Sequence, residues 1–143
     1  MIKIGITGSL ASGKSTVAKM ISSGKYPLYN ADTAVKKIYQ TNVFQTKVFK
    51  KFKLKNKKNI KNKIKKIISS DKKYLSDLEK IIHPLVRKQI IKFTKKNRGK
   101  KFLIFEIPLL IESKQMQSYD KIIFVNSRKD LRLKRYLLSL IHI

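Results

Sequence analysis

Near its start the chain reads Gly8-Ser9-Leu10-Ala11-Ser12-Gly13-Lys14-Ser15. The spacing of the two glycines, the lysine and the final serine is that of a phosphate-binding loop, or P-loop. Apolar residues alternate over residues 2–6, as they do in a short strand, and residues 14–21 can form a helix. A strand, a glycine-rich turn and a helix start surround a phosphate with backbone N–H groups and the positive end of a helix dipole. We therefore favour a P-loop over a chance turn rich in glycine and serine.

The side chains of this loop have definite expected partners. Lys14 is expected to reach the β- and γ-phosphates of a nucleoside triphosphate and so to act in catalysis. The Ser15 hydroxyl is expected to bind Mg²⁺. The residues expected to bind the nucleotide are Gly8, Ala11, Ser12, Gly13, Lys14, Ser15 and Thr16.

The composition is that of one globular domain. A chain of 143 residues is long enough to bury a sizeable core. The chain contains no cysteine, which excludes a disulfide framework, a thiolate zinc site and cysteine catalysis and suits the cytoplasm. The first residues lack the pattern of a signal peptide, and no apolar stretch approaches the length of a membrane span. We therefore expect a cytoplasmic protein without a membrane partner.

The formal net charge is +27, from 35 basic and 8 acidic residues. A polyanion partner such as RNA, DNA or an anionic membrane is one interpretation. A general lysine bias with solvated side chains is the other, and we favour it because only five of the basic residues are arginine. Nucleic-acid readers tend to use arginine and exposed aromatic residues. We therefore expect no specific nucleic-acid partner.

The order of the apolar patterns predicts an α/β fold with a parallel sheet flanked by helices. Strands are expected over residues 2–6, 27–29, 102–105 and 121–125. Helices are expected over residues 14–21, 33–39, 43–52, 60–68 and 128–138. Residues 1–143 would form a single domain that carries a helical insert at about residues 41–98.

Pro84 is expected to divide this insert further. The apolar spacing of residues 75–82 predicts one helix, which Pro84 should end. His83 would then be a non-helical residue before proline. Pro84 itself would open a second helix that runs to about Lys96.

Acidic residues are scarce, and three of them, Asp32, Glu106 and Glu112, follow apolar runs that resemble strands. Ligands of open parallel sheets bind at the carboxyl ends of the strands, so these acids and the P-loop should share one surface. Asp32 is expected to accept the proton of an acceptor hydroxyl, in preference to acting as a helix cap before Thr33. Glu106 is either an acid near Mg²⁺ or a strand-end carboxylate in a salt bridge.

A basic helix follows the last expected strand. Arg135, together with Arg132 or Arg128, is suited to clamp a transferred phosphoryl group. Their helical spacing equally describes an ordinary solvated face. His83 has two interpretations as well, a turn residue packed in the structure or a residue that binds substrate.

Taken together, these motifs resemble those of the dephospho-coenzyme A kinases, small P-loop kinases of the nucleoside-monophosphate kinase type. The segments that match, in the family's order, are Gly5-Ile6-Thr7-Gly8 through Gly13-Lys14-Ser15-Thr16, Asn30-Ala31-Asp32, Leu78-Glu79-Lys80-Ile81-Ile82-His83-Pro84, Ile107-Pro108-Leu109-Leu110-Ile111-Glu112 and Asp120-Lys121-Ile122-Ile123-Phe124-Val125. The P-loop is shared by many NTPases, whereas the Ala-Asp, His-Pro and Pro-Leu-Leu-x-Glu motifs in this order are far more specific.

The resemblance implies ATP- and Mg²⁺-dependent phosphorylation of the ribose 3′-hydroxyl of dephospho-coenzyme A, a small-molecule substrate. Asp32 matches the family's base and so serves both in catalysis and in substrate binding. His83 and Arg87 fall in the region that lines the acceptor side. Arg135 falls where a catalytic lid arginine is expected.

The chain departs from the family pattern at three points. Asn30 stands where the family has the first Asp of its Asp-Ala-Asp motif, and residues 25–98 contain no glycine. Family members continue past the lid into a final helix and strand, so the lid that begins near residue 128 is expected to be cut short. A non-functional fragment is therefore one alternative. Another small P-loop kinase and a basic nucleic-acid-binding NTPase are two more, and the oligomeric state is left open.

Overall fold

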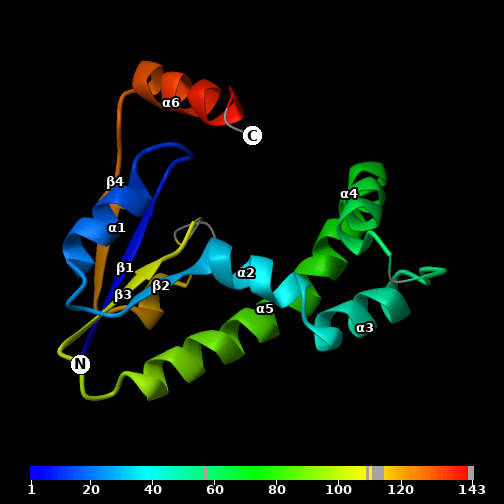
Figure 1. Cartoon of the computed structure of the whole chain (residues 1–143), viewed down its shortest axis with the longest axis horizontal. Helices are drawn as coiled ribbons and strands as arrows, with labels where there is room; N and C mark the ends of the chain where they lie inside the picture. The colour runs from blue at the N-terminus through cyan, green and yellow to red at the C-terminus, as the bar shows by residue number, and fades with distance from the viewer. Residues whose placement is uncertain (57, 109, 111–114, 142–143) are drawn as a thin grey trace. The chain divides into compact units, whose positions relative to one another are not determined.

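A computed structural model describes residues 1–56, 58–108, 110 and 115–141. Its contacts divide the chain into two compact units (Figure 1). The first unit contains residues Met1–Asp32 and Phe93–Ile143, and the second contains Thr33–Lys92. The single domain with an insert at about residues 41–98, expected from the sequence, stays a prediction.

The first unit is built on a parallel sheet of four strands in the order β2-β3-β1-β4. Its strands are β1 (Ile2–Gly8), β2 (Leu28–Asn30), β3 (Phe102–Glu106) and β4 (Lys121–Val125). The predicted α/β class and parallel sheet are confirmed. The strand expected at residues 27–29 begins one residue later, after Pro27, which lacks the N–H that a sheet ladder uses.

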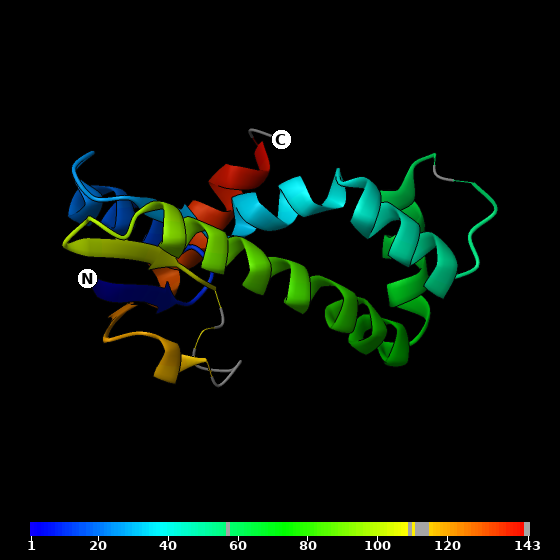
Figure 2. The same ribbon diagram turned by 90° about the horizontal axis from the view of Figure 1, so that it is seen from below.

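Helix α1 (Lys14–Ser22) covers one face of this sheet, where Ala18 packs with Ile6 and Ile104. The short 3-10 helix η1 (Met116–Ser118) lies on the opposite side (Figure 2). On that side Phe105 contacts the rings of Phe93 and Tyr119. Helix α6 (Lys129–Ile141) follows β4. It begins one residue later and ends three residues later than the helix expected at residues 128–138.

The second unit is helical. It contains most of α2 (Ala31–Tyr39) and α5 (Lys72–Lys96) and the whole of α3 (Asn42–Lys51) and α4 (Ile60–Ser70). Its buried core consists of Ile38, Phe44, Val48, Ile60, Ile64 and Leu78. Helix α3 starts at a regular cap, because the Thr41 hydroxyl accepts the backbone N–H of Phe44 at 3.3 Å. The two lysine-rich helices predicted from apolar spacing are confirmed.

The predicted break at His83 is wrong, because α5 runs without interruption through Pro84. A proline inside a helix costs about 3 kcal/mol through a lost hydrogen bond and a clash with the preceding turn. Ile82 before it and Leu85 after it both pack against the core of the second unit. This apolar packing on both sides of the proline outweighs the local preference.

Candidate functional site

The carboxyl ends of the strands gather the predicted site residues on one edge of the first unit. The P-loop follows β1, and Asp32 lies two residues beyond the end of β2. Asn30 at the end of β2 is in register with Glu106 at the end of β3. Because the strands are parallel, these groups share one edge, as the sequence predicted.

The P-loop has the backbone geometry that its glycines require. Gly8 has φ +146° and Gly13 has φ +96°. A Cβ on Gly8 would lie 2.1 Å from the carbonyl oxygen of Val125 on β4. Ala11 also has a positive φ, of 57°. Residue 8 must therefore be glycine both for its conformation and for its close approach to the next strand.

A cavity of about 370 Å³ lies beside this loop. Its lining residues are Thr7, Gly8, Ser9, Leu10, Lys14, Asp32, Pro108 and Phe124. Lys14 Nζ donates a hydrogen bond to the carbonyl oxygen of Ser9 at 2.7 Å. Asp32 is exposed in the first turn of α2. The structure thus brings the predicted P-loop lysine and the predicted base to the same cavity.

Helix α2 begins at Ala31, two residues before the predicted start at Thr33. Asp32 is therefore inside the first helical turn. The alternative that Asp32 caps a helix starting at Thr33 is wrong, because the helix already includes Asp32. Its carboxylate is left at the cavity and stabilises the positive end of the helix dipole.

Two serines of the loop show that it suits a phosphate and a metal ion. The Ser12 hydroxyl oxygen is buried and has no hydrogen-bond partner among the described residues. A phosphate oxygen would supply the missing partner. Ser15 Oγ donates to Glu106 Oε1 at 2.5 Å. A serine hydroxyl beside a carboxylate offers the oxygen ligands that Mg²⁺ prefers.

Glu106 is 3% exposed and uses both carboxylate oxygens. Oε1 accepts the Ser15 hydroxyl, and Oε2 accepts Asn30 Nδ2 at 2.5 Å. Within the described part of the chain, Glu106 has no lysine or arginine at ion-pair distance. Of its two predicted roles, the geometry favours the acid beside the metal position over the salt bridge.

Helix α6 carries Arg135 to the P-loop. Its Nη1 donates to the carbonyl oxygen of Ser12 at 3.5 Å and lies 3.7 Å from the Cβ position of Gly13. Arg128 instead forms an exposed ion pair with Asp130 at 3.3 Å. Of the three arginines proposed for the clamp, Arg135 is the one seen to contact the loop among the described residues.

His83 and Arg87 lie in the second unit. Both are exposed and stand four residues apart on α5, so they share one helix face. Their role in substrate binding stays a prediction. Half of the Ile107–Glu112 motif, including Glu112, lies outside the described residues.

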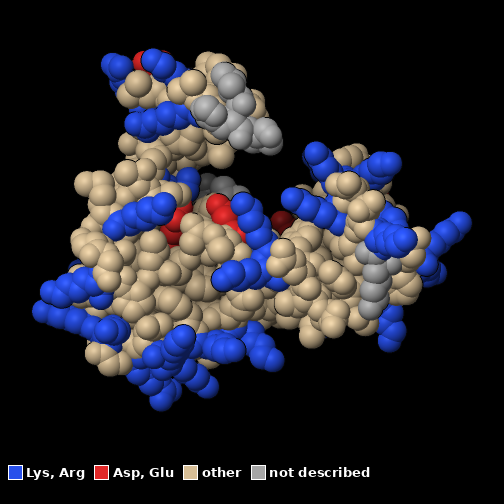
Figure 3. Space-filling view, viewed as in Figure 1, with Lys and Arg blue, Asp and Glu red and all other residues tan. Residues whose placement is uncertain are grey.

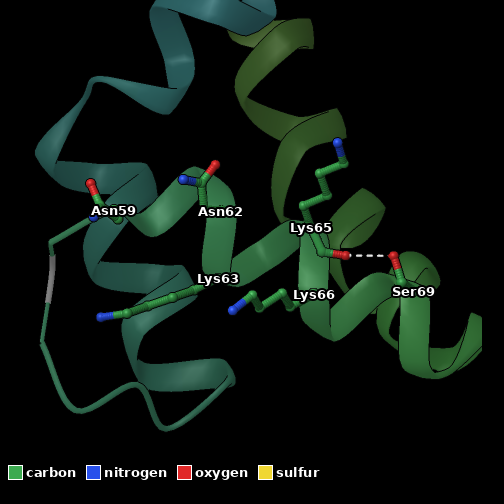
Figure 4. A pocket seen from close by; sticks show the side chains of 6 residues that line it. All are labelled: Asn59, Asn62, Lys63, Lys65, Lys66 and Ser69. Carbon is green, nitrogen blue, oxygen red and sulfur yellow. Dashed lines mark hydrogen bonds between the residues drawn. The ribbon is translucent and has the colours of Figure 1, made fainter.

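A larger hollow in the second unit is lined by lysine, asparagine and serine, and no carboxylate is among the lining residues that the structure describes. Its lining comes from α4 and the residue before it, namely Asn59, Asn62, Lys63, Lys65, Lys66 and Ser69. Lys65 points away from Lys63 and Lys66, so the three ammonium groups do not converge on one point (Figure 4). Ser69 Oγ donates to the Lys65 carbonyl, and Lys63 Nζ to the Asn56 carbonyl.

Lysine and arginine side chains are spread over the visible face of each unit (Figure 3). This spread favours the interpretation of the +27 charge as a general lysine bias.

Among the helices that the structure describes, none combines the length and the apolar character needed to span a bilayer.

Sequence reasoning missed two parts of this site. Asn30 was noted only as a replacement for aspartate, and its bond to Glu106 joins residues 76 positions apart. Phe124 of β4 lines the cavity although it had been assigned only to a strand. The available signal for both was their place near the carboxyl end of an expected strand, where ligands of parallel sheets bind. The sequence gave no indication that Phe124 is exposed or that Asn30 bonds to Glu106.

Comparisons with known proteins agree with this geometry. A family model described as dephospho-CoA kinase matches residues 2–139. The dephospho-CoA kinase of Bartonella henselae is 36% identical over 136 residues, covering 92% of this chain and 70% of the relative. That of Rickettsia typhi is 36% identical over 135 residues, covering 94% and 70%.

Solved structures resemble the chain as well. A crystal structure from Thermus thermophilus has a TM-score of 0.79 and 27% identity over 96% of this chain and 71% of its own. The dephospho-CoA kinase from Campylobacter jejuni shares the fold, with a TM-score of 0.62, 21% identity and coverage of 96% and 95%. From the family model and the curated relatives it follows that the chain belongs to the dephospho-CoA kinase family.

Proposed function

We propose that this chain transfers the γ-phosphoryl group of ATP to the ribose 3′-hydroxyl of dephospho-coenzyme A, the last step of coenzyme A synthesis. Family membership supports the reaction and the acceptor. The observation that carries the proposal for this chain's own residues is that Lys14 and Asp32 line one cavity. A cationic phosphate ligand and a carboxylate that line one cavity suit transfer to a hydroxyl.

The P-loop and α6 hold the phosphates in this proposal. Lys14 exchanges its bond to the Ser9 carbonyl for the β- and γ-phosphates, and Ser12 satisfies its buried hydroxyl with a phosphate oxygen. Arg135 stabilises the charge on the transferred group from its place beside Ser12. Ser15, supported by Glu106, holds Mg²⁺. The bound Mg²⁺–ATP supplies the phosphoryl group and an electrophilic phosphorus.

Asp32 acts on the acceptor. It orients the 3′-hydroxyl and takes its proton as the hydroxyl oxygen bonds to the γ-phosphorus. The bond between the γ-phosphorus and the β–γ bridging oxygen breaks in the same step, and ADP leaves. The binding of the acceptor by His83 and Arg87 stays a prediction from the resemblance. The cytoplasmic location and the absence of a nucleic-acid partner stay predictions.

The experiment is transfer of labelled γ-phosphate from ATP to dephospho-coenzyme A by this chain and by Asp32→Asn. The loss of a general base predicts a fall in kcat of about 10²- to 10⁴-fold, with ATP affinity unchanged. Asp71→Asn is a matched control, because Asp71 is exposed in the second unit and, among the described residues, its carboxylate accepts a local N–H from Lys73. Equal turnover by Asp32→Asn would remove Asp32 from the role.

A panel of acceptors tests the substrate. Phosphorylation of another nucleotide or small alcohol in preference to dephospho-coenzyme A would indicate a different small P-loop kinase. ATP hydrolysis stimulated by RNA or DNA, with steep salt dependence, would indicate a nucleic-acid-binding NTPase instead.

A further inference from the structure

Asn30 forms the outer link of a hydrogen-bonded chain that ends at the P-loop. Its Nδ2 donates to Glu106 Oε2, and Glu106 Oε1 accepts the Ser15 hydroxyl, each at 2.5 Å. The backbone fixes this arrangement, because Asn30 and Glu106 are in register on β2 and β3. The strand pairing therefore delivers the amide directly to the carboxylate.

These two neutral donors matter because Glu106 is a buried carboxylate. Burying a charge is costly unless it is paired or hydrogen-bonded. Among the described residues no cation pairs with Glu106, so Asn30 and Ser15 provide the observed compensation. Each carboxylate oxygen holds one donor, and the two donors together define the orientation of the carboxylate plane.

The orientation of Glu106 determines what Ser15 offers to a metal ion. A hydroxyl has one proton and two lone pairs. Because the Ser15 proton is donated to Glu106, its lone pairs are left to face the metal position. If the carboxylate rotates, the hydroxyl rotates with it and the lone pairs turn away.

We propose that Asn30 is a positioning residue for the metal–nucleotide site, acting through Glu106 on Ser15. This inference rests on the proposed function only in taking Mg²⁺–ATP as the ligand of the P-loop. It makes no use of the acceptor. An amide suits this position in this chain because it donates to the carboxylate of Glu106.

The test is ATP binding to the intact chain, measured by calorimetry with Mg²⁺ and with a chelator. Asn30→Ala should raise the Kd for Mg²⁺–ATP about tenfold, the effect of losing one hydrogen bond to a charged group. The Kd for metal-free ATP should not change. Asn97→Ala is the matched control, because the Asn97 amide also donates one bond, to the Phe93 carbonyl at the end of α5.

A double-mutant cycle tests the route through Ser15. In a Ser15→Ala background, Asn30→Ala should have little further effect, because the hydroxyl that Asn30 positions is gone. A full tenfold effect in that background would overturn the proposal. So would an equal loss of affinity with and without metal, which is the result expected of a purely structural role.

Asn30→Leu keeps the proposal testable if the alanine variant does not fold. It preserves the approximate shape of the side chain and removes the donor to Glu106, so Mg²⁺–ATP binding should weaken about as much as in Asn30→Ala. Unchanged or tighter binding would contradict the inference. Failure of phosphoryl transfer to dephospho-coenzyme A would count against the proposed function alone, because no acceptor is present in these measurements.

Discussion

Replacing Gly8 with alanine should damage the P-loop more than any other single methyl group added at a glycine of this chain. The new Cβ would lie 2.1 Å from the Val125 carbonyl oxygen. Carbon and oxygen atoms approach to about 3.3 Å even in weak hydrogen bonds, so β1 and β4 would have to separate by about 1.2 Å. Hydrogen bonds stretched by that amount no longer meet the geometry of a bond.

The expected cost combines two terms. Losing about two strand hydrogen bonds costs about 1 kcal/mol each, and holding a non-glycine residue at φ +146° costs about 1–3 kcal/mol. The sum is about 3–5 kcal/mol, which corresponds to a fall in Tm of about 10–20 °C for a chain of this length. Thermal unfolding followed by circular dichroism measures this shift, and calorimetry measures the accompanying loss of ATP binding.

Two glycines supply matched controls. Gly24 has φ +64° with no atom within 4 Å of its Cβ position, so Gly24→Ala isolates backbone strain of about 1–2 kcal/mol. Gly99 has open space, so Gly99→Ala should be neutral or stabilising by about 0.4–1 kcal/mol. The reasoning is refuted if Gly8→Ala melts within a few degrees of Gly99→Ala and still binds ATP.

Three further predictions concern other parts of the chain. Pro84→Ala should stabilise the chain by up to about 3 kcal/mol in urea unfolding, because α5 regains a hydrogen bond; a destabilised variant would contradict this. Burial raises the pKa of both Tyr29 and Tyr119 to about 12, above the unfolded value of 10.0. Above pH 10 the unfolded chain therefore binds fewer protons than the folded chain, so the free energy of unfolding should fall as the pH rises from 10 to 12. Phenolate absorbance should show two tyrosines that titrate late, and titration of both near pH 10 would oppose this prediction. Arg135→Ala should lower kcat for phosphoryl transfer about 10³-fold. Arg98→Ala, at an exposed turn, should leave kcat unchanged, and equal kcat values for the two variants would exclude Arg135 as the residue that stabilises the transferred group.

Much of the fold was predictable because local patterns report local structure. The alternation before Gly8 and the helical spacing after Lys14 identified β1 and α1 within two residues at each end. Apolar spacing likewise found α3 and α4 within the lysine-rich segment. Pro84 was the failure, because its local preference was overruled by packing that involves three other helices.

The site residues likewise include some that the sequence predicted and some contacts that it did not. The P-loop residues and Asp32 were predictable because strand ends and loop spacing are local features, and parallel strands place their carboxyl ends together. The contact of Arg135 with Ser12 spans 123 positions, and that of Ser15 with Glu106 spans 91. The sequence predicted that Glu106 and Arg135 act near the P-loop, but it did not report which atoms pair across these separations.

The amino-acid sequence alone therefore determines that a phosphate-binding loop joins a strand to a helix, since spacing and backbone conformation are properties of adjacent residues. Strand order and register were decided by the tertiary structure. They set Asn30 against Glu106 and Gly8 against Val125, because packing of the whole sheet selects which strands pair and where. That pairing turns separate polar residues into one connected site.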